Sequence, residues 1–237
     1  MQQGAEATNG ATRDLRLLEG VIANMSIFRD ATPHQRAEIA SGARLRNLRR
    51  GAAACRLGEP MPGMLVVAYG LLKLALPRPE GEERIVRFVG PNETFGEAPA
   101  LLDRPAPFEA VALADTMLLV IPRAPVLRLL ERQPVVACRL AASLAESYLS
   151  LLSELQALAQ HNGMQRLAAY LVSLAGNGEG DSRVCLPASK TTVAARLSIQ
   201  KETLSRMLRD LSERGCIRVE GRVITILDRA RLAELTG

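Results

Sequence analysis

Three side chains in the C-terminal third of the chain have types and a spacing that could read DNA. Glu202, Ser205 and Arg206 stand at positions i, i+3 and i+4, so a helix would carry all three on one face. Arg can donate two hydrogen bonds to O6 and N7 of guanine, and Glu can accept one from N4 of cytosine. On an isolated helix the same triplet is more often an ordinary solvated face, so its meaning depends on the surrounding elements.

Those elements predict a winged helix-turn-helix. Residues 191–197 favour a supporting helix, and a turn of three or four residues separates it from the helix that carries the triplet. The second helix has Leu204, Leu208 and Leu211 at a spacing that would face a core. Two strand-like runs, 217–219 and 223–226, then flank a turn that contains Gly221 and suits a tight hairpin. In such a domain the second helix enters the major groove of DNA.

Other polar residues near these helices could hold the DNA backbone. The candidates for phosphate or base contacts are Lys201, Thr203, Lys190 and Arg209. Residues 164–237 contain 12 Lys and Arg against 8 Asp and Glu, which accounts for +4 of the net charge of +5. Because Lys and Arg neutralise phosphates, this uneven charge supports an interaction with nucleic acid.

Composition is that of an ordinary globular protein, with 48% apolar residues and a mean hydropathy of +0.06. No continuous apolar stretch reaches the roughly 18–20 residues that cross a bilayer, so no membrane contact is expected. The N-terminus lacks a basic segment followed by an apolar one, so a cytoplasmic location is expected.

Neither the cysteines nor the histidines form a recognisable reactive site. Cys55, Cys138, Cys185 and Cys216 are far apart and lack the spacing of metal ligands, so buried free thiols are expected. The two histidines are 127 residues apart, and the sequence has no nucleophile or phosphate-loop motif. We therefore do not expect an enzyme.

The first half of the chain predicts an arm, a helical segment and a β-roll. Residues 1–20 form a flexible arm, and the helical region of about 15–43 contains Thr32 as an N-cap followed by Pro33. From about 44 to 121, short apolar runs alternate with turns rich in Gly, Pro and Asn, which is typical of an all-β barrel or roll. The expected strands include 64–68, 71–76, 84–89 and 111–121, and the whole domain is assigned to 21–132.

A long helix then predicts a dimer. Apolar residues alternate steps of three and four along it, namely Ala141, Leu144, Tyr148, Leu151, Leu155 and Leu158. This a/d pattern indicates a two-stranded coiled coil between two copies of the chain, although a helix packed on its own domain would show a similar pattern. Residues 133–163 are assigned to this helix and to a hinge at Asn162-Gly163, and 164–237 to the DNA-binding domain.

Several local motifs accompany this order of elements, namely Arg56-x-Gly58-Glu59-Pro60, Gly70-Leu71-Leu72-Lys73, Phe95-Gly96-Glu97, Arg166 and Glu202-Thr203-Leu204-Ser205-Arg206. With these motifs, the order of elements resembles the Crp/Fnr family of bacterial transcription regulators over roughly residues 20–230. The resemblance implies an α+β fold with an N-terminal, cyclic-nucleotide-binding-like β-roll as sensor. A long dimerisation helix and a C-terminal winged helix-turn-helix would follow.

The resemblance also implies a DNA sequence. In the Fnr-like branch, Glu, Ser and Arg at this spacing read TTGAT half-sites of an inverted repeat, and those roles pass to Glu202, Ser205 and Arg206. The segment 198–200 resembles the dissimilatory nitrate-respiration, nitric-oxide-responsive regulators, and RNA polymerase is a partner that the family implies. Lys201 departs from the cyclic-AMP receptor branch, which has Arg there, and a phosphate contact is the favoured role for it.

The resemblance leaves the effector open. Cyclic-AMP binding would need Arg-Ser about ten residues after Gly96-Glu97, but residues 105–109 read Pro-Ala-Pro-Phe-Glu, so cyclic AMP is not expected. A [4Fe–4S] cluster is not expected either, because no cysteine precedes Cys55.

Haem is a further candidate effector group, because the nitric-oxide-responsive relatives are thought to use it. His34 and His161 are its candidate ligands, and Glu97, Leu151, Leu152 and Leu155 are candidates for an effector pocket. The alternative function is a haem- or small-molecule-binding sensor module whose main role is not DNA reading.

Overall fold

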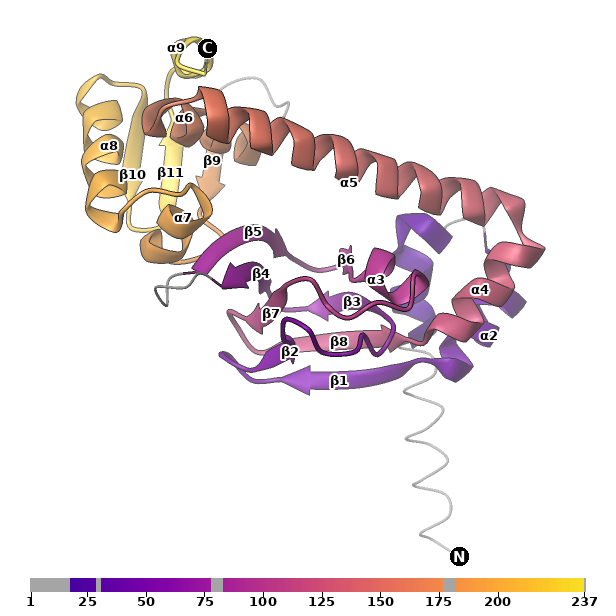
Figure 1. Cartoon of the computed structure of the whole chain (residues 1–237). Helices are drawn as coiled ribbons and strands as arrows, with labels where there is room; N and C mark the ends of the chain where they lie inside the picture. The colour runs from indigo at the N-terminus through magenta and orange to yellow at the C-terminus, as the bar shows by residue number, and fades with distance from the viewer. Residues whose placement is uncertain (1–17, 29–30, 78–82, 177–181, 237) are drawn as a thin grey trace, which may run out of the picture. The chain divides into compact units, whose positions relative to one another are not determined.

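The computed structural model describes residues 18–28, 31–77, 83–176 and 182–236, which form two compact units. The first unit comprises residues up to 77 together with 86–147. The second comprises 78–85 and 148–237, and helix α5, Pro134–Gln160, contributes to both (Figure 1). This division lies inside the helix that the sequence assigns to a separate dimerisation segment.

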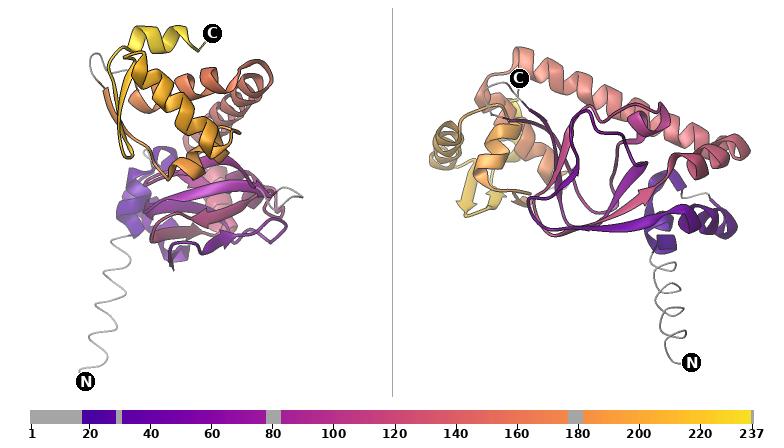
Figure 2. Two further views of the ribbon diagram at one scale, coloured as in Figure 1. Left: turned by 90° about the vertical axis from the view of Figure 1, so that its left-hand side faces the viewer. Right: turned by 60° about the horizontal axis from the view of Figure 1, so that its bottom comes forward.

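The first unit is a β-roll made of two four-stranded sheets, and its strands wrap around a common interior (Figure 2). One sheet has the strand order β1-β8-β3-β6 and the other β2-β7-β4-β5. The strands are β1 Arg44–Leu48, β2 Ala53–Cys55, β3 Met64–Tyr69, β4 Leu72–Pro77, β5 Glu83–Val89, β6 Thr94–Phe95, β7 Glu109–Ala112 and β8 Thr116–Ile121. The prediction of a β-roll is therefore confirmed.

One predicted strand, 111–121, is wrong as a single element. The run is divided into β7 and β8 by a turn at 113–115. The Thr116 hydroxyl donates a 2.8 Å hydrogen bond to the Ala114 carbonyl, and the Asp115 carboxylate accepts one of 2.9 Å from the Arg50 amide. Gly70, with a φ of +97°, approaches Thr116 so closely that a Cβ would lie 2.4 Å from its hydroxyl oxygen. Contacts across more than 40 residues thus hold the turn.

Short helices cover one end of the roll. Residues 18–24 are helical, and they are followed by η1 Ser26–Phe28, α2 Pro33–Gly42, α3 Glu97–Leu101 and α4 Arg123–Arg132. The start of α2 agrees with the sequence: Thr32 Oγ1 accepts from the Gln35 amide at 3.3 Å, Gln35 Oε1 accepts from the Thr32 amide at 2.7 Å, and Pro33 is the first helical residue. This capping box satisfies backbone donors that the helix itself leaves unpaired.

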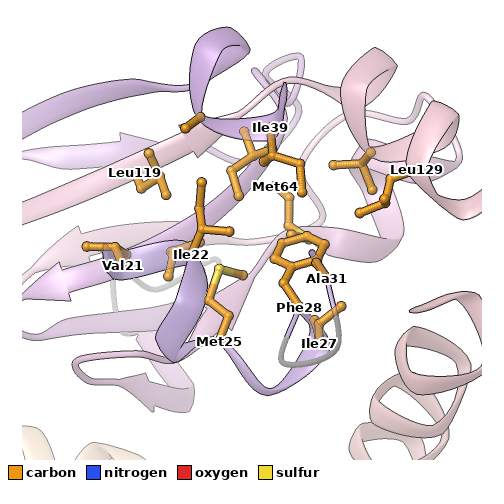
Figure 3. Close-up of a cluster of buried hydrophobic side chains, with 14 of the residues drawn as sticks. Val21, Ile22, Met25, Ile27, Phe28, Ala31, Ile39, Met64, Leu119 and Leu129 are labelled. Carbon is orange, nitrogen blue, oxygen red and sulfur yellow. The ribbon is translucent and has the colours of Figure 1, made fainter. Parts of the chain in front are cut away.

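The roll buries apolar residues on both faces of its sheet β1-β8-β3-β6. Met64 and Val66 of β3 pack with the N-terminal helices, where Phe28 and Ile39 are also buried (Figure 3). Leu65 and other residues that alternate with them pack into the interior of the roll. Because both faces are covered, β3 reads as an uninterrupted apolar run.

The second unit is built around one hydrophobic core. Its elements are α6 Gly163–Ala175, β9 Ser182–Cys185, α7 Lys190–Arg196, α8 Lys201–Glu213, β10 Ile217–Glu220, β11 Val223–Ile226 and α9 Arg229–Glu234. The three strands form one sheet in the order β10-β11-β9, so the hairpin predicted from the sequence has a third strand that the sequence analysis missed.

Asn162 lies between α5 and α6, where the sequence places a hinge. Helix α5 ends at Gln160, and Asn162 is the N-cap of α6. Its side chain accepts from the Gln165 amide at 3.0 Å, and Gln165 returns a bond to the Asn162 amide at 2.8 Å. Asn162 thus begins the next helix and does not extend the apolar stripe of α5.

Helix α5 carries an apolar surface that the single chain leaves exposed. Tyr148 and Leu155 are each 61% exposed, and Leu151 is 47% exposed. By length and composition alone, α5 is long and apolar enough to cross a membrane, although Arg139, Glu146 and Glu154 interrupt its apolar residues. An apolar helix face that a second protein covers would meet the same criteria.

The cysteines divide into two buried and two exposed side chains, which corrects the prediction that all are buried. Cys55 and Cys216 lie in the cores of the two units, whereas Cys138 and Cys185 are exposed. Burial raises the pKa of Cys55 to about 11, so its thiol stays protonated at neutral pH.

Cysteine labelling should follow this division. With iodoacetamide at pH 7.5, we expect Cys185 to be alkylated rapidly and Cys55 and Cys216 to be protected in the folded protein. Mass spectrometry of peptides after timed quenching measures the four rates, and labelling in urea provides the fully reactive control. If Cys55 and Cys185 were alkylated at equal rates without denaturant, the burial of Cys55 in the core of the roll would be contradicted.

The Tyr170 hydroxyl should contribute nothing to stability. It is buried without a hydrogen-bond partner among the described residues, and burial raises its pKa to about 12 although the charge of Arg196 opposes the shift. Because an unsatisfied buried polar group costs about 1–3 kcal/mol, Tyr170→Phe should leave the free energy of unfolding unchanged or raise it.

The same substitution should alter the alkaline limit of stability. The wild type loses stability as pH rises from about 10 to about 12, since only the unfolded chain ionises Tyr170 readily in that range, and Tyr170→Phe lacks this part of the loss. Urea unfolding at pH 7 and pH 10.5 measures both effects. A loss of more than about 1 kcal/mol at pH 7 would show that the hydroxyl has a partner.

Candidate DNA-binding site

Helices α7 and α8 form a helix-turn-helix whose turn is held by backbone contacts. Ser189 caps α7 by accepting from the Thr192 amide at 3.2 Å. After α7, Ser198 adopts a left-handed φ of +54°, and the Ile199 amide donates to the Ala194 carbonyl at 3.0 Å. The chain thereby reverses within four residues and starts α8 at Lys201.

Helix α8 separates an apolar face from a polar face. Leu204, Leu208 and Leu211 are buried in the core of the second unit, as the sequence predicts. Glu202, Ser205 and Arg206 are exposed on another side of the helix, within its first two turns. The three predicted base-reading residues therefore lie together on the accessible surface of the helix.

These side chains are available for new hydrogen bonds. Glu202 and Arg206 form no ion pair with another residue in the described ranges. The Ser205 hydroxyl donates to the Lys201 carbonyl of its own helix at 3.0 Å, which leaves its lone pairs free to accept. Arg206 keeps its full set of donors, which is what two bonds to one guanine require.

The predicted flanking residues have different environments. Lys201 is exposed at the first position of α8, whereas Lys190, at the start of α7, and Thr203 are half-buried. Arg209 is paired with Glu213 at 2.8 Å on the exposed surface of α8. Exposed pairs of this kind are weak, so a DNA phosphate could compete with Glu213 for Arg209.

The β10–β11 hairpin, which is the wing of this domain, adds basic residues to the candidate site that were not predicted from the sequence. Arg218 is exposed on β10, and Arg222 follows the turn at Gly221, where it donates to the Leu186 carbonyl at 3.2 Å. The Arg222 contact ties the hairpin to the segment between β9 and α7. In the sequence, both residues could have been identified by their position beside the hairpin turn, because basic residues there could contact DNA phosphates.

The residues proposed for an effector site do not come together within one unit. Glu97 begins α3 in the first unit, whereas Leu151, Leu152 and Leu155 belong to the second unit and are exposed. The grouping of these four residues in one pocket therefore stays a prediction.

The two histidines are also separated. His34 is exposed near the start of α2. His161 follows α5, is half-buried, and has an Nδ1 atom without a partner among the described residues. No group of three or more His, Cys, Asp or Glu that could hold a metal ion occurs in the part of the chain that the structure describes.

The segment 105–109 is closed onto the roll by its own backbone. The Ala106 amide donates to the Glu59 carbonyl and the Gly58 amide donates to the Ala106 carbonyl, both at 2.8 Å. Phe108 packs with Phe95 of β6, with ring centroids 6.4 Å apart. The segment contains no cation that could hold a phosphate.

Comparisons with known proteins agree with this architecture. Residues 45–133 match the model of the cyclic nucleotide-binding domain, and residues 165–235 match that of the Crp-like helix-turn-helix domain. Among solved structures, FixK2 from Bradyrhizobium japonicum superposes with a TM-score of 0.74 at 23% identity, over 82% of this chain and 98% of that chain, and shares its fold.

Two relatives show how similar the sequence is to those of known regulators. The cyclic AMP receptor protein of Thermus thermophilus is 32% identical over 178 residues, which cover 75% of this chain and 81% of the relative. The transcriptional activator protein anr of Pseudomonas aeruginosa is 27% identical over 196 residues, which cover 81% and 80% of the two chains. With its roll, long helix and winged helix-turn-helix in this order, the chain belongs to the Crp/Fnr family of transcription regulators.

Proposed function

We propose that two copies of this chain form a transcription regulator that reads a TTGAT-like inverted repeat and responds to a signal sensed in the β-roll. The observation that carries the proposal is the exposed face of α8, on which Glu202, Ser205 and Arg206 lie without an ion-pair partner among the described residues. Arg206 and Glu202 supply the donor and acceptor that a guanine and a cytosine need. The proposal includes a cytoplasmic location and RNA polymerase as a further partner.

Dimerisation is supported by the uncovered stripe of α5. Tyr148, Leu151 and Leu155 are exposed at a/d spacing, and Leu149 and Leu152 widen the apolar surface beside them. At the N-terminal end of the predicted seam the apolar side chains are less exposed, because Leu144 packs partly against the core of the roll. A two-fold symmetric pair would present two recognition helices to two half-sites of an inverted repeat.

The effector in this proposal is not a cyclic nucleotide. The cyclic phosphate would need a cation and hydroxyl donors, whereas the segment 105–109 supplies apolar residues and the carboxylate of Glu109. A haem that senses nitric oxide rests on the resemblance alone, since neither His34 nor His161 lies among the apolar side chains that fill the roll. Whatever the effector, it must bind two arrangements of the dimer with different affinity.

Replacing Arg206 should weaken and relax DNA reading. We expect Arg206→Ala to lose about 1–3 kcal/mol of binding free energy for a TTGAT palindrome, with reduced discrimination at one base pair of each half-site. Titration of labelled duplexes in 150 mM salt with competitor DNA measures both quantities. Arg214→Ala is the matched control, because Arg214 lies just beyond the other end of α8 and pairs with Asp210. Unchanged affinity and specificity in Arg206→Ala would exclude the assignment of this residue.

A charge in the α5 stripe should separate the two copies. We expect wild-type protein to sediment as a dimer at micromolar concentration and Leu155→Glu to sediment as a monomer, because each copy would bring a buried carboxylate to the seam. The control is Leu102→Glu, since Leu102 is also 61% exposed but lies after α3 in the roll. A dimeric Leu155→Glu variant, or a monomeric wild type, would contradict the proposed seam.

A further inference from the structure

We infer that the ion pair between Glu154 and Arg196 positions the helix-turn-helix on the dimer helix, and so determines which spacing of DNA half-sites the dimer accepts. The inference rests on the proposed function, because half-site spacing has meaning only for a dimer that reads DNA. Both residues belong to the second unit, Glu154 on α5 and Arg196 at the end of α7.

The pair is close and sheltered. Nη2 of Arg196 lies 2.5 Å from Oε1 of Glu154, across 42 residues of sequence. The two side chains are only 21% and 33% exposed, whereas those of the Arg209–Glu213 pair on α8 are 81% and 64% exposed. Since water screens an exposed pair much more strongly, the Glu154–Arg196 pair is the better suited to hold two helices in one geometry.

A second arginine reinforces the same junction. Arg166 of α6 donates from Nε to the Leu197 carbonyl at 3.0 Å and from Nη1 to the His161 carbonyl at 2.5 Å. It therefore joins the residue that follows α7 to the segment that follows α5. Both of these hydrogen bonds go to backbone carbonyls, whereas the Glu154–Arg196 pair joins side chains of α5 and α7 directly.

The neighbouring helices approach closely at this point. A Cβ on Gly163, at the start of α6, would lie 2.7 Å from Cε of Met207 on α8 and 3.3 Å from Cγ2 of Ile199 in the turn. The absence of a side chain on Gly163 lets α6 pack against the recognition helix. Since α7 and α8 are also buried in one hydrophobic core, a shift of α7 relative to α5 would carry α8 with it.

Glu154 also borders the predicted dimer seam. It lies three residues after Leu151 and four before Leu158, which places it at the edge of the a/d stripe, where charged residues flank the seam of a coiled coil. The same two turns of α5 would thus contact the second copy on one face and α7 on the adjoining face. The dimer axis and the recognition helix are linked through those turns.

This link has a consequence for DNA. Two recognition helices fit successive major grooves only when their separation matches the half-site spacing of about one helical turn, roughly 34 Å. If the ion pair holds α7 in place, removing it should let the recognition helix adopt several positions. The dimer should then bind its preferred spacing less tightly and tolerate altered spacings better.

The test measures affinity for duplexes that carry the same two half-sites with the spacer changed by one or two base pairs. We expect wild-type protein to disfavour each altered spacer by about tenfold or more. In Glu154→Gln and Arg196→Gln that discrimination should fall at least roughly fivefold, and the double variant should lose little more than either single variant. The exchanged pair, Glu154→Arg with Arg196→Glu, should recover most of the wild-type profile.

Asp210→Asn is the matched control, because it breaks a more exposed ion pair, Asp210–Arg214, in the same unit. It should leave the spacer profile unchanged, and thermal unfolding shows whether each variant is folded. If Glu154→Gln and Arg196→Gln fold and keep the wild-type profile, the inference is wrong and the DNA-binding proposal stands. If wild-type protein binds no spaced repeat, the proposed function itself fails.

If neither Glu154→Gln nor Arg196→Gln folds, the variant with the exchanged pair tests the inference. A folded exchanged pair with the wild-type spacer preference supports the inference. A folded exchanged pair that has lost the preference, or an exchanged pair that also fails to fold, overturns it, because the pair would then contribute to folding without setting the spacing.

Discussion

The constraint on which the other features depend is that α5 serves both units while part of its surface stays apolar and exposed. Its N-terminal half buries Val136 and Leu140 against the roll, and its C-terminal half presents Tyr148, Leu151 and Leu155 to solvent. Exposed leucines and a tyrosine at a/d spacing are stabilised when a second helix covers them. In the proposed dimer, a change in the roll that altered the pairing of the two helices would reach the DNA-binding unit along α5, which belongs to both units.

The DNA-binding unit is built around a hydrophobic core of its own. Leu204, Leu208 and Leu211 anchor α8 on a core shared with α6 and the three-stranded sheet. The residues proposed to read bases, Glu202, Ser205 and Arg206, are exposed on the opposite side, so anchoring and the proposed reading would use different residues of α8. Arg166 and the Glu154–Arg196 pair connect this unit's helices to the C-terminal part of α5 and the segment that follows it.

Segment 105–109 of the roll bears on the proposal that the effector is not a cyclic nucleotide. Glu97 remains at the start of α3, but segment 105–109 is fixed by backbone bonds to the turn at 58–60 and by the packing of Phe108 on Phe95. These contacts fix a segment that has no cation of its own. In the function proposed above, the roll would therefore take an effector of different chemistry, or transmit a change that begins elsewhere on its surface.

Features that depend on neighbouring residues could be read from the sequence. Thr32 and Pro33 mark the start of α2 because capping involves residues three apart, and the leucine spacing of α8 follows from helical periodicity. The same periodicity places Glu202, Ser205 and Arg206 on one face whatever the rest of the fold does. The order of roll, long helix and winged helix-turn-helix is likewise a property of the linear pattern.

Features that depend on distant partners were decided only by the tertiary structure. The turn that divides 111–121 is held by Arg50 and Leu71, and β9 is recognisable only through its pairing with β11. Burial distinguishes Cys55 from Cys185 although both stand in strand-like sequence. Nothing in the sequence joins Glu154 to Arg196, because each looks like a surface charge on an amphipathic helix until folding brings α5 and α7 together and removes both side chains from most of the solvent.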